Sequence, residues 1–543
     1  MIHFAEINTL AQTLPFHAER TPEKLALVSK DGEVTYQQLN ELSGRAANAL
    51  LAEGIPSGSR VAYLGKESQA YFELIFACAK TKNVIVPINW RLTSDEVKHI
   101  LSDSESVILV VDHDLTAIID PIKSELKHLN KILLADSPHS LSQNSPTQSQ
   151  NNTDLVETTK DYTYQNWRDS ASDTHIEIKV KGKDAVAQLY TSGTTGLPKG
   201  VVLPHQSYFK VRDALQSESL HWIDWQEGDN SLIGIPGFHV GGLWWSAQGF
   251  NAGITNISIP VFSSQLAIKL IKDYPITTMC VVPAMIQMIL SEKNIQSSDF
   301  HSLRKVVYGG SPIGETLLSR GIEIMDCDFA QIYGLTETGN TAVCLPPEAH
   351  QIGSELLKAA GRPYPGFALK IIDSNNNILT TGEVGEVCIK TPSHMLEYWK
   401  NPKATFETLV DGWIHTGDAG YLNAAGYLFI CDRIKDTIIV AGENVYPAEI
   451  ENALGKCDGV VESAVIGIPD ERWGEAILAF IVFDESAEQS IRQVCLALQN
   501  KLASFKIPTQ FKIVDKIPRN ASGKILRRIL RDEFWKNKER MVN

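Results

Sequence analysis

The chain has 543 residues, of which 43% are hydrophobic and 21% charged, and its formal net charge is -14 at pH 7. This length exceeds a single hydrophobic core and predicts several folding units, whereas the acidic balance disfavours a nucleic-acid or anionic-membrane surface, because either needs a basic face. The eight cysteines are scattered without a Cys-x-x-Cys pair, which predicts reduced, mostly buried thiols rather than a zinc or redox motif.

The N-terminus has no basic region followed by an apolar stretch, and no apolar run is long enough to cross a bilayer. We therefore expect a cytoplasmic protein with no integral membrane segment and no nucleic-acid partner. A small molecule is the partner that fits the composition best.

The first part of the chain alternates helical and strand-like patterns. A helical pattern begins at Thr35 and Tyr36, and β-type apolar runs occupy residues 60–64 and 106–111. This alternation predicts a mainly parallel sheet. Residues 137–154 are rich in Ser, Gln and Asn, which predicts a mobile surface segment.

A glycine- and hydroxyl-rich loop follows at residues 190–200. It reads Tyr-Thr-Ser-Gly-Thr-Thr-Gly-Leu-Pro-Lys-Gly. Glycines let backbone N–H groups turn toward an anion, hydroxyls add donors and the lysine adds charge, so the loop suits a polyphosphate. No Gly-Lys-Ser/Thr closes it, and a β-branched run rather than a helix follows, which argues against a P-loop. The alternative is an ordinary surface turn.

The pattern of predicted secondary structure changes after about residue 344. Short strand patterns at residues 368–372, 385–390 and 427–430 alternate with Gly, Asn and Asp turns and predict a small β-rich unit. An α/β texture resumes after residue 434, and the basic end of the chain is interpreted as a solvated helix.

Further clusters that suit a nucleotide lie downstream of the loop, although each alone is also consistent with a plain turn. They comprise Gly310, Ser311 and Pro312 after an apolar strand; Tyr333, Gly334, Thr336 and Glu337; and Asp418 and Arg433. Two further motifs follow them: a segment with Lys435, Gly442 and Glu443, which predicts a sharp turn before an acidic helix start, and a flexible loop that presents Lys524.

Together these motifs, in this order, resemble the adenylate-forming superfamily of acyl- and aryl-CoA synthetases, carrier-loading adenylation domains and firefly-type luciferases. The resemblance covers nearly the whole chain and is greatest to fatty acyl-CoA synthetases. It departs from the usual pattern at Glu397, Asn423 and residues 82–83, none of which is expected to do chemistry.

The resemblance implies an α/β fold. A large N-terminal domain (1–433) would hold two α/β subdomains (1–180 and 181–350) and a small β-barrel-like subdomain (351–433). A small, mobile α+β domain (434–543) would follow, with Lys435 at the hinge.

The implied activity is that of a magnesium-dependent acid–thiol ligase. ATP and a carboxylic acid would give an acyl-adenylate and pyrophosphate, and coenzyme A would then take the acyl group with release of AMP. A homodimer is the assembly that we consider for this protein.

The resemblance also assigns roles to residues of this sequence. Lys524 would span the carboxylate and the α-phosphate, Glu337 would hold Mg²⁺, and His239 would stand between the acid and thiol tunnels. The remaining expected contacts are phosphates for Thr191, Ser192, Gly193, Thr194, Thr195, Gly196, Lys199 and Thr336; adenine for Gly310, Ser311, Pro312, Tyr333 and Gly334; ribose for Asp418 and Arg433; and the thiol tunnel for Gly442 and Glu443.

Residues 238–250 should border the acyl pocket and contain no charge to pair with an amino group or a second carboxylate. We therefore expect a medium- or long-chain fatty acid. The alternatives are an aryl or cinnamate-like acid, since Trp244 and Trp245 suit either a tunnel or a ring, and a standalone enzyme that loads a carrier protein.

Overall fold

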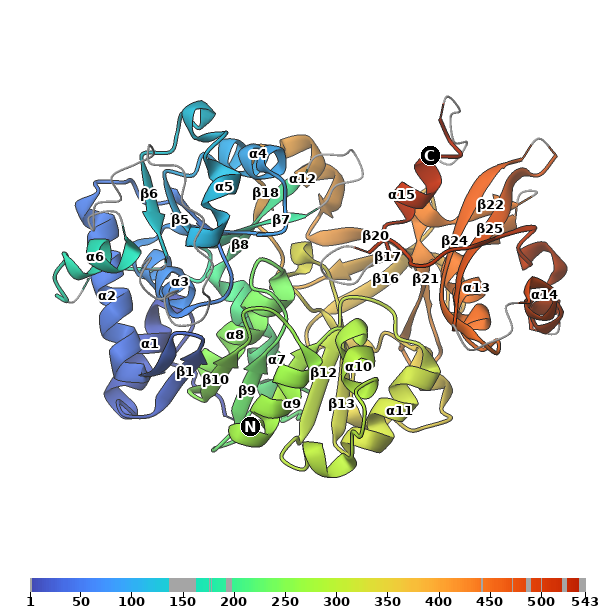
Figure 1. Ribbon diagram of the computed structural model, residues 1–543, viewed down its shortest axis with the longest axis horizontal. Coiled ribbons are helices and arrows are strands. Elements are labelled where there is room, and N and C mark those ends of the chain that lie inside the picture. Colours follow the sequence, from blue (N-terminus) through green and yellow to red (C-terminus); the bar gives the residue numbers. More distant parts are fainter. Residues whose placement is uncertain are drawn as a thin grey trace, which may run out of the picture.

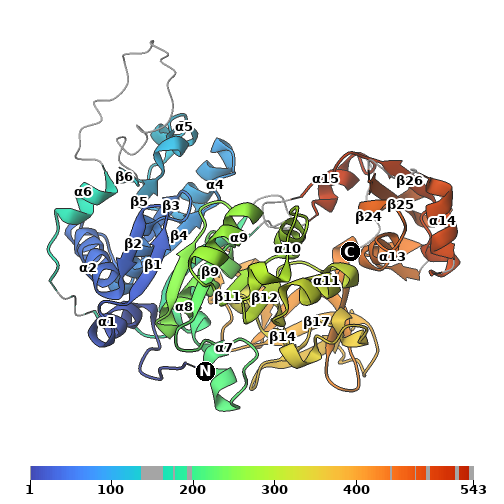
Figure 2. The same cartoon turned by 60° about the horizontal axis from the view of Figure 1, so that its bottom comes forward.

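The computed structural model describes residues 2–135, 163–174, 176, 178–191, 198–440, 443–470, 472–484, 490–499, 501–519 and 525–536. The predicted mobile segment at 137–154 lies outside these residues. Four sheets carry the fold, and Figures 1 and 2 show the C-terminal strands and helices set apart at one end of the molecule.

The largest sheet is mostly parallel and has nine strands. Its order is β15-β14-β13-β12-β11-β9-β10-β1-β2. The bounds are β1 Leu25–Ser29, β2 Gly32–Thr35, β9 Asn230–Ile233, β10 Thr255–Ser258, β11 Thr278–Val281, β12 Lys305–Gly309, β13 Asp328–Tyr333, β14 Val343–Leu345 and β15 Arg362–Pro363.

A seven-stranded sheet has the order β18-β8-β7-β4-β3-β5-β6. Its bounds are β3 Arg60–Leu64, β4 Val84–Ile88, β5 Ile108–Val111, β6 Lys131–Leu134, β7 Ala185–Thr191, β8 Lys199–Pro204 and β18 Glu397–Tyr398. Strands β1 and β2 thus belong to the nine-stranded sheet, and β7 and β8 to this one. The two large sheets therefore each take strands from both sides of the predicted boundary between residues 180 and 181. The predicted domain limits stay predictions.

Two smaller sheets follow. One pairs β16 Ala368–Ile372, β17 Gly385–Lys390, β20 Trp413–Leu422, β19 Leu409–Val410 and β21 Leu428–Arg433. The other pairs β23 Glu443–Val445, β22 Ile438–Val440, β25 Gly474–Phe483, β24 Val460–Asp470 and β26 Gln510–Ile513. The last sheet has core clusters of its own, built from buried residues between 438 and 517, beside the main core.

Helices cover the sheets and separate the two large ones. They are α1 Leu10–Arg20, α2 Tyr36–Ala52, α3 Gln69–Thr81, α4 Ser94–Ser104, α5 Thr116–Ile119, α6 Tyr164–Asp169, α7 Lys210–Ser217, α8 Val240–Ala252, α9 Ser264–Asp273, α10 Pro283–Leu290, α11 Glu315–Met325, α12 Pro402–Thr408, α13 Pro447–Leu454, α14 Ile491–Gln499 and α15 Arg527–Asp532. Among the described residues, none of the helices has the length and apolar character that a bilayer crossing requires.

Helix α8 is central to the site. It packs on β9, β10 and β11 on one side and near α1 on the other, so one continuous core joins the two large sheets. Its C-terminal boundary is locally encoded, because Gly253 closes the helix with φ +67°, a left-handed conformation that glycine adopts without strain. At the other end His239 is the N-cap residue, without a capping hydrogen bond from its side chain.

Candidate functional site

The glycine-rich loop closes a β-hairpin. Thr191, the last residue of β7, pairs with Lys199, the first of β8, in antiparallel register. The loop's predicted phosphate ligands Ser192, Gly193, Thr194, Thr195 and Gly196 lie outside the described residues. Because a strand and not a helix follows the loop, the expectation that this is not a P-loop is confirmed.

Lys199 of this hairpin is connected to Glu337 through the side chain of Tyr398. Its Nζ lies 5.0 Å from the centre of the Tyr398 ring, and the Tyr398 hydroxyl donates a 2.6 Å hydrogen bond to Oε1 of Glu337. Tyr398 reaches this place because β18 pairs with β8, which sets Tyr398 opposite Val201. Burial and the Glu337 charge raise the pKa of Tyr398, so it stays a neutral donor.

Glu337 itself is buried. It lies in the short 3-10 helix Thr336–Thr338, and its carbonyl accepts a hydrogen bond from the backbone of Met395. The preceding Gly334 is required by packing, since a Cβ there would lie 2.4 Å from the carbonyl oxygen of Asn340. The sequence analysis assigns no role to Tyr398, because its contact with Glu337 joins residues far apart in the chain.

A second cluster joins three strands around Asp418. The Tyr333 hydroxyl donates to Oδ2 of Asp418 at 2.6 Å, and Nε of Arg433 lies 2.7 Å from Oδ1. Arg433 also donates to the Thr416 carbonyl at 3.1 Å. Asp418 is 5% exposed, so its charge is compensated almost wholly by these partners.

The two clusters are close enough to interact. Burial lowers the pKa of Arg433, but the charges of Asp418, Tyr333 and Glu337 outweigh burial and raise the pKa above its ordinary value. The predicted set Tyr333, Glu337, Asp418 and Arg433 is therefore brought together at one place.

The residues expected to contact adenine lie at the same sheet edge. Gly309 of β12 pairs with Ile332 of β13, so Gly310 and Tyr333 follow at neighbouring strand ends. Gly310 has φ +84°, which turns the chain out of the strand, and Ser311 and Pro312 follow at least partly exposed. This edge holds the carboxyl ends of parallel strands, where α/β sheets bind ligands.

His239 is the residue that precedes helix α8. Its Nε2 is buried and has no hydrogen-bond partner among the described residues, and its ring packs on Phe238 at 4.6 Å. Burial, with a smaller contribution from the Arg91 charge, lowers the pKa of His239 to about 4. The imidazole is therefore neutral near pH 7.

Glu67 is an acidic neighbour of this turn that sequence reasoning missed. It is 3% exposed, and Oε1 accepts a hydrogen bond from the backbone N–H of Gly237. A Cβ on Gly237 would collide with the hydroxyl of Tyr71, so only glycine fits. Burial raises the pKa of Glu67 to about 7. The residues 238–250 thus carry no charge themselves, but a buried carboxyl group supports the turn before them.

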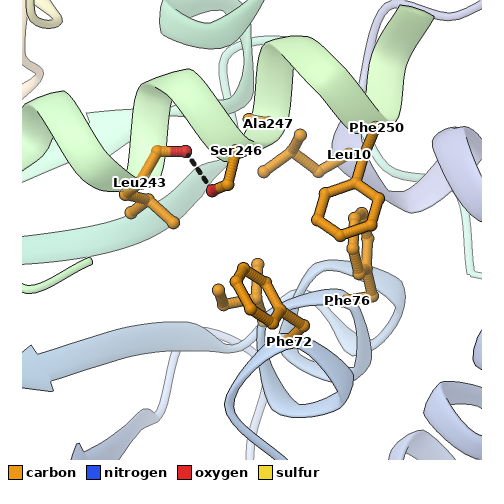
Figure 3. Close-up of a pocket in the computed structure, with 8 residues that line it drawn as sticks. Leu10, Phe72, Phe76, Leu243, Ser246, Ala247 and Phe250 are labelled. Carbon is orange, nitrogen blue, oxygen red and sulfur yellow. Dashed lines mark hydrogen bonds between the residues drawn. The ribbon is translucent and has the colours of Figure 1, made fainter. Parts of the chain in front are cut away.

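The face of α8 toward α3 is apolar. Figure 3 shows a small cavity lined by Phe72, Phe76, Leu243, Ala247 and Phe250, among others. Its polar member, Ser246, donates to the carbonyl of Leu243 at 2.9 Å. Both tryptophans of α8 are buried, and Trp245 donates to the carbonyl of Leu232, which places Trp245 in the core.

The predicted hinge follows directly after Arg433. Lys435 lies in the 3-10 helix Ile434–Asp436, and burial lowers its pKa. Arg531 binds Asp436 at 2.8 Å, and the Ala448 N–H donates to Asp432 at 2.8 Å, so both flanks are tied to the C-terminal part.

The remaining predicted residues are separate from these clusters or outside the described chain. Glu443 is exposed on β23, whereas Gly442 and Lys524 lie outside the described residues. The described residues Arg519 and Ile525 form an antiparallel bridge.

Comparison with known proteins identifies the class. A model of the AMP-binding enzyme family matches residues 14–399, and one of the AMP-binding enzyme C-terminal domain matches residues 449–524. The chain belongs to the AMP-binding enzyme family and is an adenylate-forming ligase.

Individual relatives match over nearly their full lengths. The fatty acid–[acyl-carrier-protein] ligase ScoC of Streptomyces coeruleorubidus is 51% identical, with 100% of this chain and 99% of ScoC covered. The long-chain-fatty-acid–CoA ligase FadD13 of Mycobacterium tuberculosis is 35% identical, covering 93% and 94%. The crystal structure of ATP-bound MatB from Rhodopseudomonas palustris superimposes with a TM-score of 0.83 at 28% identity, covering 97% and 99%.

Proposed function

We propose that this protein activates a fatty acid with ATP and transfers the acyl group to the thiol of a pantetheine arm. The observation that carries the first step is the buried Asp418 carboxylate, held between Tyr333 and Arg433 at a strand edge. Such a preset carboxylate accepts hydrogen bonds from the two ribose hydroxyls of ATP. Gly310, Ser311, Pro312 and Gly334 would frame the adenine together with the Tyr333 ring.

The chemistry requires two anions to meet. The carboxylate and the triphosphate repel each other, so positive charges and oriented donors must neutralise both. Lys524 would bridge the carboxylate and the α-phosphate, while residues 191–199 and Thr336 would hold the departing pyrophosphate. Removing one such donor typically costs about 3 to 4 kcal/mol of transition-state stabilisation.

Glu337 fits the magnesium ion that the family implies. Its carboxylate supplies the hard oxygen ligands that Mg²⁺ prefers, and the Tyr398 hydroxyl fixes its orientation through Oε1. Magnesium would supply charge neutralisation of the phosphates when bound. Lys199, stacked over Tyr398, adds a positive charge to the same region.

The apolar surroundings of α8 favour a hydrocarbon tail. The cavity in Figure 3 is lined almost entirely by aliphatic and aromatic side chains, but it has room for about one water molecule and is too small to be the acyl pocket itself. The support for a hydrocarbon tail is the uncharged helix α8, which carries the neutral His239 at its N-terminus. ScoC and FadD13, which match over nearly their full lengths, are both named as fatty acid ligases.

The acceptor thiol distinguishes two versions of the second step. The 51% identity to ScoC, a carrier-protein ligase, supports pantetheine on an acyl carrier protein. The 35% identity to FadD13 supports free coenzyme A, which is the second candidate. We propose the carrier protein as the preferred acceptor, with Gly442 and Glu443 near the thiol path.

A competition assay tests this proposal. The purified enzyme, ATP, Mg²⁺ and decanoic acid are supplied with equal concentrations of coenzyme A and a holo-acyl carrier protein, and both thioesters are quantified by mass spectrometry. We expect AMP release that depends on the acid. The main thioester should be the fatty acyl group bound to the carrier protein. Predominant acyl-CoA would reverse the acceptor assignment, and AMP release that no fatty acid stimulates would reject fatty acid activation.

A further inference from the structure

Three side chains of the types that bind transition metals gather in the sheet that contains Asp418. Glu386 and Cys388 are two residues apart on β17, on either side of an irregularity in the pairing with β20, and His415 of β20 is the register partner of Cys388. One ligand atom from each residue lies within 4.8 Å of the other two.

The burial of the three residues suits an ion that enters from solvent. Cys388 is fully buried, whereas the side chains of Glu386 and His415 are 24% and 18% exposed. A cation would thus reach the buried sulfur past two partly exposed ligands, and water could complete a tetrahedron. The negative charges of the Cys388 thiolate and the Glu386 carboxylate together neutralise the two positive charges of a divalent ion, which limits the free-energy cost of burying it.

We propose that Glu386, Cys388 and His415 form a binding site for a thiophilic divalent cation of the zinc class. Oxygen, sulfur and imidazole nitrogen are the donors that Zn²⁺ accepts. On binding, the Sγ–metal bond replaces the S–H bond of Cys388, and the proton goes to solvent without any redox change. Affinity therefore rises with pH.

The same carboxylate supports the nucleotide residues. Glu386 accepts the backbone N–H of Gly417 through Oε1 at 3.0 Å and lies 3.1 Å from Nδ1 of His415 through Oε2. The Thr416 hydroxyl in turn donates to the Val387 carbonyl at 2.7 Å and accepts from the Asp418 N–H at 3.1 Å. These bonds fix the backbone from His415 to Asp418.

A bound cation would compete for that support. Ligation through Oε2 draws the Glu386 carboxylate and the His415 ring toward the metal, so the hydrogen bond from the Gly417 N–H to Oε1 weakens and the Asp418 backbone shifts. The metal should then weaken ATP binding. This consequence rests on the proposed function, whereas the metal site itself does not.

Cobalt serves as the spectroscopic probe for the site. Metal-free full-length protein is titrated with Co²⁺, and the thiolate-to-cobalt charge-transfer band and the visible ligand-field bands are recorded. The variant Cys388→Ser removes the sulfur ligand. Its matched control is Cys431→Ser, since Cys431 lies on β21 of the same sheet and outside the cluster.

We expect one equivalent of Co²⁺ to give both bands, Zn²⁺ to displace it, and the charge-transfer band to disappear in Cys388→Ser but not in Cys431→Ser. No charge-transfer band in the wild type, or the same band in Cys388→Ser, would overturn the site.

Activity then tests the coupling to ATP. Stoichiometric Zn²⁺ should raise KM for ATP at least about fivefold in the wild type and leave Cys388→Ser unaffected. An unchanged KM in a protein that gives the cobalt band would refute the coupling alone. Absence of acid-dependent activity with Mg²⁺ present and no Zn²⁺ added would refute the proposed function and leave the cobalt result standing.

Discussion

At the scale of single residues, the hydrogen bond from Tyr333 to Asp418 is the most direct test of the ribose site. Tyr333→Phe removes one donor to a charged acceptor, which is worth about 1.5 to 3 kcal/mol. We expect KM for ATP to rise roughly tenfold or more, with little change in KM for the acid. Steady-state kinetics with each substrate varied in turn gives both values.

Tyr308→Phe is the matched control for this substitution. Tyr308 lies on the adjacent strand β12, and its hydroxyl contacts Gln331 and His350 rather than Asp418. This variant should lower stability but leave KM for ATP unchanged. Equal effects of the two substitutions would show that Tyr333 acts through general packing.

The buried carboxyl group of Glu67 leads us to expect that the stability of the folded protein depends on pH. Burial raises its pKa to about 7 in the folded protein, against an ordinary value of 4.5. The folded state therefore prefers the protonated form, and the protein loses stability as pH rises from about 4.5 to about 7.

Glu67→Gln should remove this loss while its amide oxygen still accepts from Gly237. Above pH 7 we expect the variant to be more stable than the wild type by about 3 kcal/mol, with the difference vanishing near pH 4.5. Urea unfolding across this pH range measures it. Glu73→Gln is the contrasting control, because Glu73 is paired with Arg168 at 2.9 Å and its loss should destabilise. A pH-independent difference for Glu67→Gln would contradict the account.

At the scale of elements, the 3-10 helix Ile434–Asp436 connects the β-rich unit to the C-terminal part. If the C-terminal part turns between the two half-reactions, these few residues must absorb the backbone change. Lys435→Pro fixes φ there, and an unfavourable proline costs about 3 kcal/mol, equivalent to about a hundredfold in rate.

We therefore expect Lys435→Pro to slow thioester formation from a supplied acyl-adenylate far more than adenylate formation. Lys435→Ala, which keeps the backbone free, separates this effect from the loss of the side chain. Each half-reaction is followed alone by rapid quench. Unimpaired thioester formation in the proline variant would refute the hinge assignment.

Local patterns predicted individual elements well. Thr35 caps α2 by accepting from the Gln38 N–H, and β3, β16 and β17 have the predicted bounds. These features depend on capping and on short apolar runs bounded by turn residues, which neighbouring residues encode. The class of enzyme also followed from motif order.

Contacts between distant segments were not encoded locally. Tyr398 binds Glu337 across 61 positions, and Glu67 binds Gly237 across 170, because strand pairing and helix packing bring them together. The cluster of Glu386, Cys388 and His415 has no Cys-x-x-Cys signature for the same reason. Its ligands meet only through the register of β17 and β20.

At the scale of the whole molecule, the site is assembled from parts that no single folding unit contains. The hairpin of β7 and β8 belongs to the seven-stranded sheet, Tyr333 to the nine-stranded sheet, and Asp418 and Arg433 to the five-stranded sheet that follows. Nucleotide binding should therefore hold these units together. We expect ATP with Mg²⁺ to raise the thermal unfolding temperature of the wild type and not of Asp418→Ala, as measured by calorimetry.

The central claim is that this assembly forms an acyl-adenylate from a fatty acid. Pyrophosphate exchange into ATP measures that step without any acceptor thiol. We predict exchange that depends on medium- or long-chain fatty acids in the wild type and falls by about a hundredfold or more in Lys524→Ala. Wild-type exchange that no fatty acid stimulates, or full exchange in Lys524→Ala, would contradict the account.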